Sequence, residues 1–208
     1  MKIKNLLFDL GGVIMDIRRD NAVEALTRLG MNDADKLLGD YVQNGIFRSL
    51  EEGNLSPQAF TDAVRNYFPE NGKGITDKDI NEAFMKFLIG IPVHRLRQLE
   101  ELRKTYKIYM LSNTTLIMWE GDIKKDFKID GHDLEYYFDG IVTSFEAHSV
   151  KPHADIFRFA IEKLKINPEE TLFLDDSEKN LETAERLGFH TLHVPTDKEF
   201  FELLECRL

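Results

Sequence analysis

Short apolar runs alternate with helical patterns from residue 90 to the C-terminus, and this alternation constrains the fold more than any other feature of the sequence. Strands that alternate with helices form parallel sheets whose two faces are both covered. The sequence therefore predicts an α/β fold with a doubly wound parallel sheet. The predicted elements are a helix at 93–105 and strands at Lys107–Leu111, Gly140–Thr143, Thr171–Leu174 and His190–His193.

One more strand is expected near the N-terminus. The apolar run at 3–8 ends abruptly at Asp9 and leads into the glycines Gly11 and Gly12, which is typical of a buried strand that enters a turn. From about residue 20 to 90 the apolar period becomes helical. Four helices are predicted there, with apolar residues at 23–29, 37–42, 60–68 and 80–88, and Ser56 and Pro57 open the third.

The first strand is thus separated from the others by an all-helical insertion. We predict a core domain formed by residues 1–18 and 90–208 and a helical cap formed by residues 19–89.

Composition and charge limit the possible partners. The chain has 208 residues, 42% of them hydrophobic, so it can bury a full core. The net charge of -10 argues against nucleic acid and anionic membranes as partners. The N-terminal apolar stretch is similar to the start of a secretory signal, but Asp9 interrupts it. No run approaches the ~18 apolar residues of a membrane span. The lone cysteine, Cys206, allows no intrachain disulfide, so we expect a soluble protein of the reducing cytoplasm.

Four polar spots recur at the carboxyl ends of predicted strands, where open α/β sheets bind ligands. Phosphoryl transfer through a covalent intermediate needs a carboxylate nucleophile, a divalent metal, and donors for the phosphate oxygens. Carboxylate pairs supply the hard oxygen ligands that magnesium prefers, and hydroxyl and ammonium groups bind phosphate. The four spots are Asp9, Ser112 with Asn113, Lys151 with Pro152, and Asp175 with Asp176.

Each spot alone also has an ordinary structural explanation. Asp9 with its glycines fits a plain strand and turn, and the segment 112–114 fits the cap of the next helix. Lys151 fits a solvated lysine that precedes a helix. The acidic pair 175–176 fits the start of a helix, where negative charge complements the helix dipole. Their order and their placement at successive strand ends favour the chemical interpretation.

This order resembles the haloacid dehalogenase-like superfamily over essentially the whole chain. The matching motifs are Phe8–Asp16, Leu111–Thr114, Lys151–Pro152 and Phe173–Asn180. The resemblance implies a Rossmann-like core in which the first strand lies between the second and the fourth. It also implies that the helical insertion is the family's C1 cap.

The resemblance further implies a magnesium-dependent phosphatase that hydrolyses a small phosphorylated metabolite through an aspartyl-phosphate. Asp9 would attack phosphorus, and Lys151 would neutralise Asp9 and the phosphate. The metal would be Mg²⁺, with the backbone carbonyl of Gly11 among its ligands. The implied site residues are Asp9 and Lys151 for catalysis, Ser112, Asn113 and Lys151 for substrate binding, and Asp9, Gly11, Asp175 and Asp176 for the metal.

Gly11 departs from the family pattern. Phosphatases of the family carry a second aspartate at this position, as the acid that protonates the leaving group and then the base for water. Loss of that acid removes a contribution of about 10²- to 10⁴-fold. Three explanations are open: an acid from elsewhere, such as Asp16 or the cap residues Glu51 and Glu52; a good leaving group, such as an anomeric sugar phosphate; or weak activity.

A narrower resemblance favours the good leaving group. The segments Phe8–Asp16, Gly45–Arg48, Glu52–Ser56 and Leu111–Thr114 are similar to the bacterial glucose-1-phosphate phosphatase group. A hemiacetal oxygen leaves more easily than an ordinary alkoxide, so less protonation is needed.

Two other functions stay open. A 2-haloacid dehalogenase also uses an aspartate nucleophile and lacks the second aspartate, but it needs no metal. The pair 175–176 would then place unneutralised negative charge beside Asp9, which opposes this alternative. The other alternative is a catalytically silent phosphate-binding regulatory protein. The presence of Asp9, Ser112, Lys151 and the acidic pair 175–176 opposes it.

Overall fold

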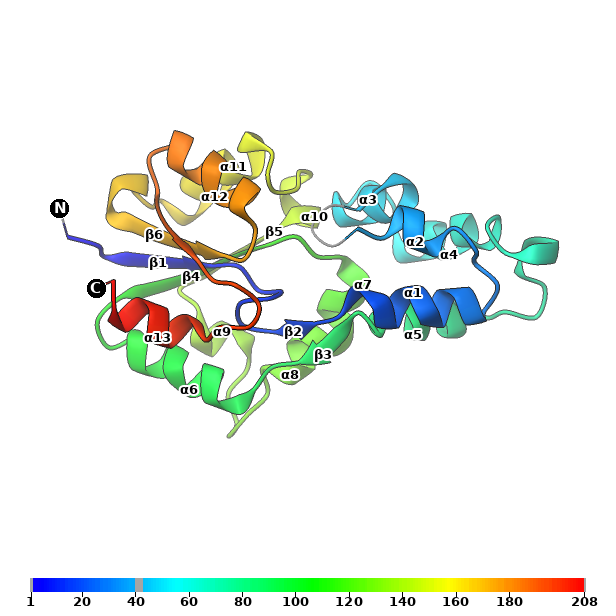
Figure 1. The fold of residues 1–208 in the computed structure, drawn as a ribbon, viewed down its shortest axis with the longest axis horizontal. Coiled ribbons are helices and arrows are strands. Elements are labelled where there is room, and N and C mark those ends of the chain that lie inside the picture. The colour runs from blue at the N-terminus through cyan, green and yellow to red at the C-terminus, as the bar shows by residue number, and fades with distance from the viewer. Residues whose placement is uncertain (1, 40–42, 208) are drawn as a thin grey trace.

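The computed structural model describes residues 2–39 and 43–207. A sheet with helices on both faces forms one part of the molecule, and a helical insertion extends from one end of it (Figure 1). The sheet has the strand order β5-β4-β1-β6-β7, and all its pairings are parallel. This confirms the predicted α/β class with the first strand between the second and the fourth. The strands are β1 (Asn5–Phe8), β4 (Lys107–Ser112), β5 (Gly140–Thr143), β6 (Thr171–Asp175) and β7 (His190–His193).

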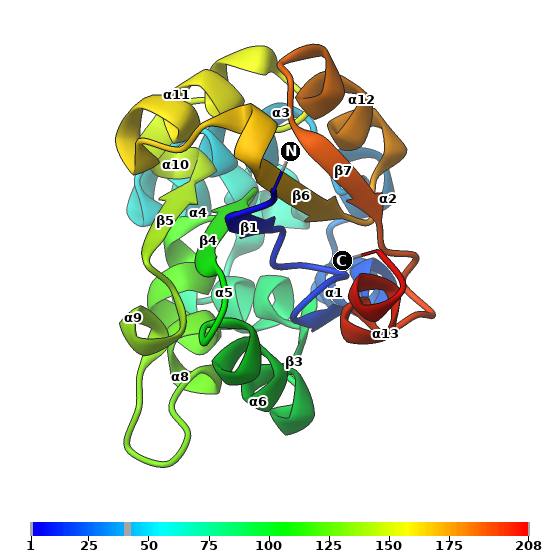
Figure 2. The same ribbon diagram turned by 90° about the vertical axis from the view of Figure 1, so that its left-hand side faces the viewer.

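Side chains of β1 alternate between two apolar layers, because successive residues of a strand face opposite sides of the sheet. Leu6 and Phe8 belong to the cluster that includes α6 and α13, whereas Leu7 belongs to the cluster that includes α11 and α12. Figure 2 shows these helix pairs on opposite sides of the sheet. The helices are α6 (Val93–Leu102), α11 (Ala154–Leu164), α12 (Glu178–Arg186) and α13 (Phe200–Glu205).

The insertion has its own apolar centre. Phe47, Phe60 and Phe84 are buried, with ring centroids 5.2 to 5.5 Å apart. The Ser56 hydroxyl accepts a hydrogen bond from the Ala59 amide, which confirms the predicted start of the third helix. The described elements of the insertion are α1 (Arg19–Arg28), α2 (Ala34–Leu37), α3 (Gly45–Glu51), α4 (Pro57–Arg65), a 3-10 turn (Pro69–Gly72) and α5 (Asp77–Met85).

Helix α3 was not expected from the sequence. Glycine commonly ends a helix, but Gly45, with a positive φ of 55°, is the first residue of α3. The predicted second helix is also shorter than expected, since α2 ends at Leu37 and Leu38 is extended. The rest of that prediction, at 40–42, lies outside the described residues.

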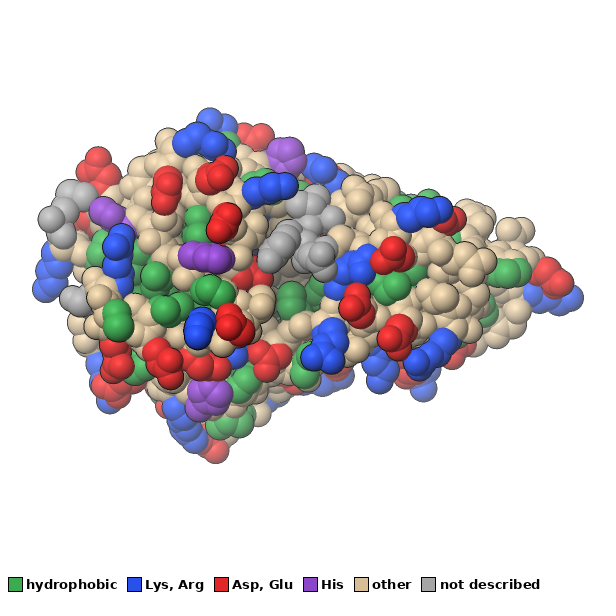
Figure 3. Space-filling view, in the orientation of Figure 1, with side chains coloured by type: hydrophobic (Ala, Val, Ile, Leu, Met, Phe, Trp, Pro, Cys, Tyr) green, Lys and Arg blue, Asp and Glu red, His purple; other side chains and the backbone are tan. Residues whose placement is uncertain are grey.

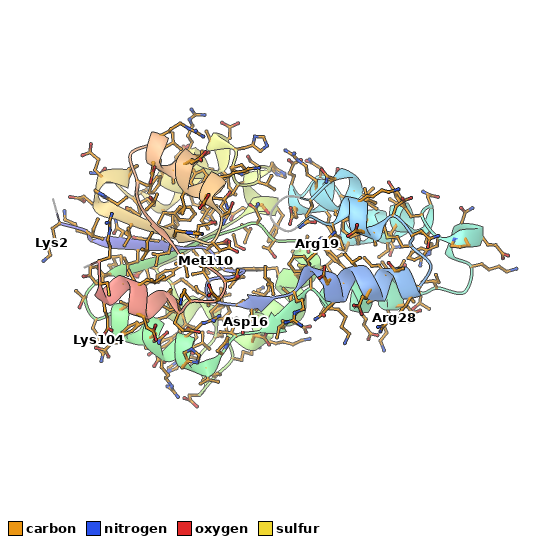
Figure 4. The ribbon with its side chains drawn as sticks, viewed as in Figure 1. Lys2, Asp16, Arg19, Arg28, Lys104 and Met110 are labelled. Atoms are coloured by element: carbon orange, nitrogen blue, oxygen red, sulfur yellow. The ribbon has the colours of Figure 1, made fainter. Side chains whose placement is uncertain are left out.

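A two-stranded antiparallel pair joins the insertion to the core, between β2 (Asp16–Ile17) and β3 (Leu88–Gly90). Asp16 lies where the chain leaves the core toward α1 (Figure 4). Strands of two and three residues are too short for a period to be recognised in sequence. None of the helices at 2–39 and 43–207 is long and apolar enough to cross a membrane. The remaining elements are α7 (Leu116–Met118), a π-helical turn (Trp119–Ile123), α8 (Lys124–Asp126), α9 (Leu134–Tyr137), α10 (Ser144–Ala147) and a 3-10 turn (Pro168–Glu170).

Candidate active site

Strand register brings the predicted acids together. Phe8 of β1 lies opposite Leu174 of β6, so the following residues, Asp9 and Asp175, stand side by side at the carboxyl edge of the sheet. The Asp9 amide donates to the Leu174 carbonyl at 2.9 Å. Ser112 ends the neighbouring strand β4 at the same edge. The central strand β1 runs toward the insertion (Figure 1), so this edge of the sheet faces the insertion.

Lys151 is buried between two of these acids. Its Nζ lies 2.7 Å from Asp9 Oδ1 and 2.7 Å from Asp175 Oδ2, and its side chain is only 1% exposed. Burial lowers the pKa of Lys151, but the carboxylates of Asp175 and Asp9 outweigh burial and raise it overall. Lys151 is therefore a charged member of the site, and the explanation as a solvated surface lysine is wrong.

Asn113 makes a contact that the sequence did not indicate. Its side-chain oxygen accepts from the Lys151 amide at 2.8 Å, and its side-chain nitrogen donates to the Lys151 carbonyl at 3.0 Å. This reciprocal pair fixes the loop that carries Lys151. The Asn113 amide group, predicted to bind substrate, is thus engaged with the protein backbone.

The helix-cap explanation for residues 112–114 is also wrong. Helix α7 is capped by Thr115, whose hydroxyl accepts from the Met118 amide. Thr114, which the motif contained but to which no role was given, lines the cavity and has a buried hydroxyl with no hydrogen-bond partner among the described residues. Ser112 is 2% exposed, and its hydroxyl has only a long contact of 3.4 Å with the Asn113 carbonyl.

Three acids converge at the sheet edge. Asp9, Asp175 and Asp176 each offer a carboxylate oxygen within 4.8 Å of the others. Asp175 is held most firmly: Oδ1 accepts from the Ser177 amide at 2.8 Å and from Asn180 Nδ2 at 2.9 Å, while Oδ2 faces Lys151. The acids therefore differ in their surroundings, and Asp175 orients Lys151.

The acids lie in an unfavourable electrostatic environment. Burial raises the pKa of Asp9 well above its ordinary value; Lys151 opposes the rise, and Asp175 and Asp176 add to it. Burial and the neighbouring Asp175 raise the pKa of Asp176 to about 6. Three carboxylates against one ammonium leave two negative charges uncompensated, which is the charge that a divalent cation neutralises.

The glycine turn that follows β1 forms another side of the site. The Leu10 carbonyl accepts from the amides of Ile14 and Met15, and the Gly12 amide donates to the Met15 carbonyl. Among the described residues, this pattern leaves the Gly11 carbonyl outside the hydrogen bonds of the turn. Gly12 has a φ of +79°, and a Cβ there would lie 2.4 Å from Asp176 Oδ2. Gly12, and not Gly11, is therefore the position where the conformation requires glycine.

A cavity connects these groups with the helical insertion. The core contributes Asp9, Gly11, Ser112, Lys151 and Asp176, and apolar side chains of both parts form much of the remaining wall. Asp175 is absent from this lining because it is fully buried. The insertion contributes Gln43, Glu51, Phe84 and Phe87.

The fold and this constellation define an enzyme class. The chain belongs to the haloacid dehalogenase-like hydrolase family, which it matches over residues 3–188.

Its relatives lie in the same family. The chain is 38% identical to the D-ribitol-5-phosphate phosphatase of Bacteroides thetaiotaomicron over 189 residues, covering 91% of this chain and 90% of that protein. Among solved structures, a HAD family enzyme of Bacteroides thetaiotaomicron in complex with magnesium and inorganic phosphate is 35% identical, with a TM-score of 0.88 and coverage of 97% of this chain and 98% of that one. A HAD-like family hydrolase from Porphyromonas gingivalis is 31% identical, with a TM-score of 0.89 and coverage of 100% and 98%.

Proposed function

We propose that the protein is a magnesium-dependent phosphatase that hydrolyses a small sugar or polyol phosphate through an aspartyl-phosphate at Asp9. The observation that carries this proposal is the buried cluster of three carboxylates around Lys151. A haloacid dehalogenase needs no cation, and its site would not gain from the two uncompensated charges. The phosphatase activity of the D-ribitol-5-phosphate relative supports the same substrate class for this chain.

The donor set fits Mg²⁺. Carboxylate and carbonyl oxygens are its preferred ligands, and water and phosphate oxygens complete the octahedron. Asp9, Asp176 and the Gly11 carbonyl would hold the ion directly. Asp175 completes the acidic group, but its two oxygens already accept hydrogen bonds, so we assign it mainly to orienting Lys151. Bound there, the ion would supply Lewis-acid stabilisation of the phosphoryl oxygens.

The protein's own groups then have separate tasks. Asp9 is the nucleophile, and the ammonium of Lys151 at 2.7 Å opposes the rise in the pKa of Asp9 that burial causes. Ser112 offers a hydroxyl to the phosphoryl group. Asn113 would act through the backbone of Lys151, because both polar atoms of its side chain bind there.

We further propose that residues 19–89 form a substrate-selecting cap on a core of residues 1–18 and 90–208. Acidic and basic side chains are interspersed on the face in Figure 3, as suits a small-molecule enzyme that binds neither nucleic acid nor membrane. The single cysteine, Cys206, is free and exposed, which supports a cytoplasmic location.

Phosphate release from a panel of sugar and polyol phosphates with Mg²⁺ tests the function. We expect turnover by the native enzyme and none by Asp9→Asn, because an amide oxygen is a poor nucleophile of nearly the same size. Circular dichroism checks that the variant is folded. Halide release from 2-haloacids without phosphate release, or undiminished turnover by Asp9→Asn, would overturn the proposal.

A further inference from the structure

The proposed phosphatase lacks a proton donor where its family carries one. Gly11 has no side chain, yet the alkoxide that leaves from a polyol phosphate is strongly basic and requires a proton in the transition state. The anomeric oxygen of some sugar phosphates would reduce this need, but a polyol phosphate has only alkoxide leaving groups. An acid from elsewhere in the chain must therefore reach the cavity.

Two acidic candidates are committed to other partners. Asp16 accepts from Arg95 at 2.7 Å at the junction with the cap (Figure 4), and it does not line the cavity. Glu52 accepts from Nε of Arg48 at 2.9 Å and is likewise outside the lining. Neither carboxylate is placed to donate a proton to a bound phosphate ester.

Glu51, unlike Asp16 and Glu52, lines the cavity and has no partner among the described residues. It lines the same cavity as Asp9, Ser112 and Lys151, although it comes from helix α3 of the cap. It is only 8% exposed. Among the described residues its carboxyl group has neither a hydrogen bond nor an ion pair. A buried carboxyl without a partner is costly, and such a group in a cavity is a functional candidate.

The C-terminal end of α3 is held against the core segment that carries Lys151. Arg48 Nη2 contacts His153 Nε2 at 2.8 Å, and the Glu52 carbonyl contacts His148 Nδ1 at 3.0 Å. Gly53, with a φ of +68°, approaches so closely that a Cβ would lie 2.4 Å from the Phe145 carbonyl oxygen. These contacts flank position 51 on both sides, so its placement at the cavity is fixed by docking of the cap.

The protonation state suits an acid. Burial is the main cause that raises the pKa of Glu51 to about 8, and the neighbouring Glu52 adds to the rise. Arg48 and Lys151 oppose it, but Arg48 is shared with Glu52 and His153, and Lys151 lies between Asp9 and Asp175. His148 faces the Glu52 carbonyl. At neutral pH the Glu51 carboxyl is therefore mostly protonated and able to donate.

We propose that Glu51 is the general acid and base that replaces the missing aspartate at Gly11. In the first step Asp9 forms a bond to phosphorus, the bond from phosphorus to the ester oxygen breaks, and that oxygen takes the Glu51 proton and leaves as an alcohol. In the second step the Glu51 carboxylate takes a proton from water as the water oxygen attacks phosphorus. Asp9 and inorganic phosphate are released, and Glu51 is protonated again.

Glu51→Gln, paired with Glu52→Gln as a matched control at the C-cap of the same helix, tests this inference. Each enzyme is assayed on a polyol phosphate and on p-nitrophenyl phosphate, whose leaving group needs no proton. We expect Glu51→Gln to lower kcat/KM for the polyol phosphate by about 10²- to 10⁴-fold and for the aryl phosphate by about tenfold at most. Glu52→Gln should change neither rate by more than about tenfold. Retained aryl phosphatase activity shows that Glu51→Gln is folded.

A pH profile separates acid catalysis from a structural role. Native kcat/KM for the polyol phosphate should fall as pH rises through about 8, where Glu51 loses its proton, and this fall should be absent in Glu51→Gln. Equal losses of kcat/KM on both substrates, or no loss on either, would overturn the assignment of Glu51. Failure of the proposed function looks different, because the native enzyme would then release no phosphate from either ester.

Discussion

The adjacent glycines after Asp9 should respond differently to the same small substitution. A Cβ at Gly12 would lie 2.4 Å from Asp176 Oδ2, and ordinary contact begins near 3.4 Å, so the carboxylate must retreat by about 1 Å in Gly12→Ala. Alanine at the Gly12 φ of +79° also carries a backbone penalty of about 1–2 kcal/mol. At Gly11, φ lies outside the positive region and the nearest atom is the flexible end of Ile17, at 3.2 Å.

The magnitudes follow from these distances. For Gly12→Ala we expect the free energy of unfolding to fall by about 1–2 kcal/mol, or Tm by roughly 2–8 °C in a chain of this length. Displacing a metal ligand by about 1 Å should lower turnover by about 10²-fold and raise the magnesium concentration for half-maximal activity. Gly11→Ala should stay within about 1 kcal/mol of the native protein, because its backbone conformation suits alanine.

Thermal unfolding and phosphate release across a magnesium titration measure both effects. The refuting result is a Gly12→Ala protein that matches Gly11→Ala in Tm and in magnesium response. The Asp176 carboxylate would then tolerate a Cβ at position 12 without moving. Its assignment as a metal ligand positioned by close contact with Gly12 would be wrong.

Two further predictions concern a metal ligand and an ion pair. Asp176→Ala should lose most activity at any magnesium concentration, because Lewis-acid assistance is worth several kcal/mol; full phosphate release in excess chelator would contradict this. Arg95 lowers the pKa of Glu199 from 4.5 to about 2, so their pairing stabilises the fold above about pH 4.5 and this contribution is lost as pH falls toward 2. Glu199→Gln should therefore lower Tm at neutral pH and have a shrinking effect below pH 4.5, which thermal unfolding at several pH values measures; a constant difference would exclude the linkage.

The parallel sheet could be predicted because its strands are short apolar runs that alternate with helical patterns. Each predicted core strand is present, and β4 and β6 extend one residue beyond the prediction, through Ser112 and Asp175. The convergence of Asp9, Ser112 and Asp175 follows from this sheet alone, because neighbouring parallel strands end at one edge. Sequence order was therefore sufficient to bring these three residues together.

Other features depend on contacts that no local pattern encodes. Helix α3 has seven residues and begins with a glycine, a residue type that commonly ends helices. In the sequence, Lys151 cannot be distinguished from a surface lysine. Only the folded loop that follows β5 places it beside Asp9 and Asp175. The task of Asn113 depends on a backbone 38 residues away. Because these contacts are long-range, the sequence predicted which residues form the site better than it predicted what each of them does there.

Placing the acid on the cap also has a consequence for the order of events. With an aspartate at position 11 the proton donor would belong to the core, beside the nucleophile whether or not the cap is docked. Glu51 instead reaches the cavity through a helix whose flanking contacts, at Arg48 and Gly53, are made with the core segment that carries Lys151. Proton donation would then require the docked cap, which would also exclude water from Asp9 while the ester bond breaks. With glycine at position 11, one catalytic task would thus belong to the insertion that we propose selects the substrate.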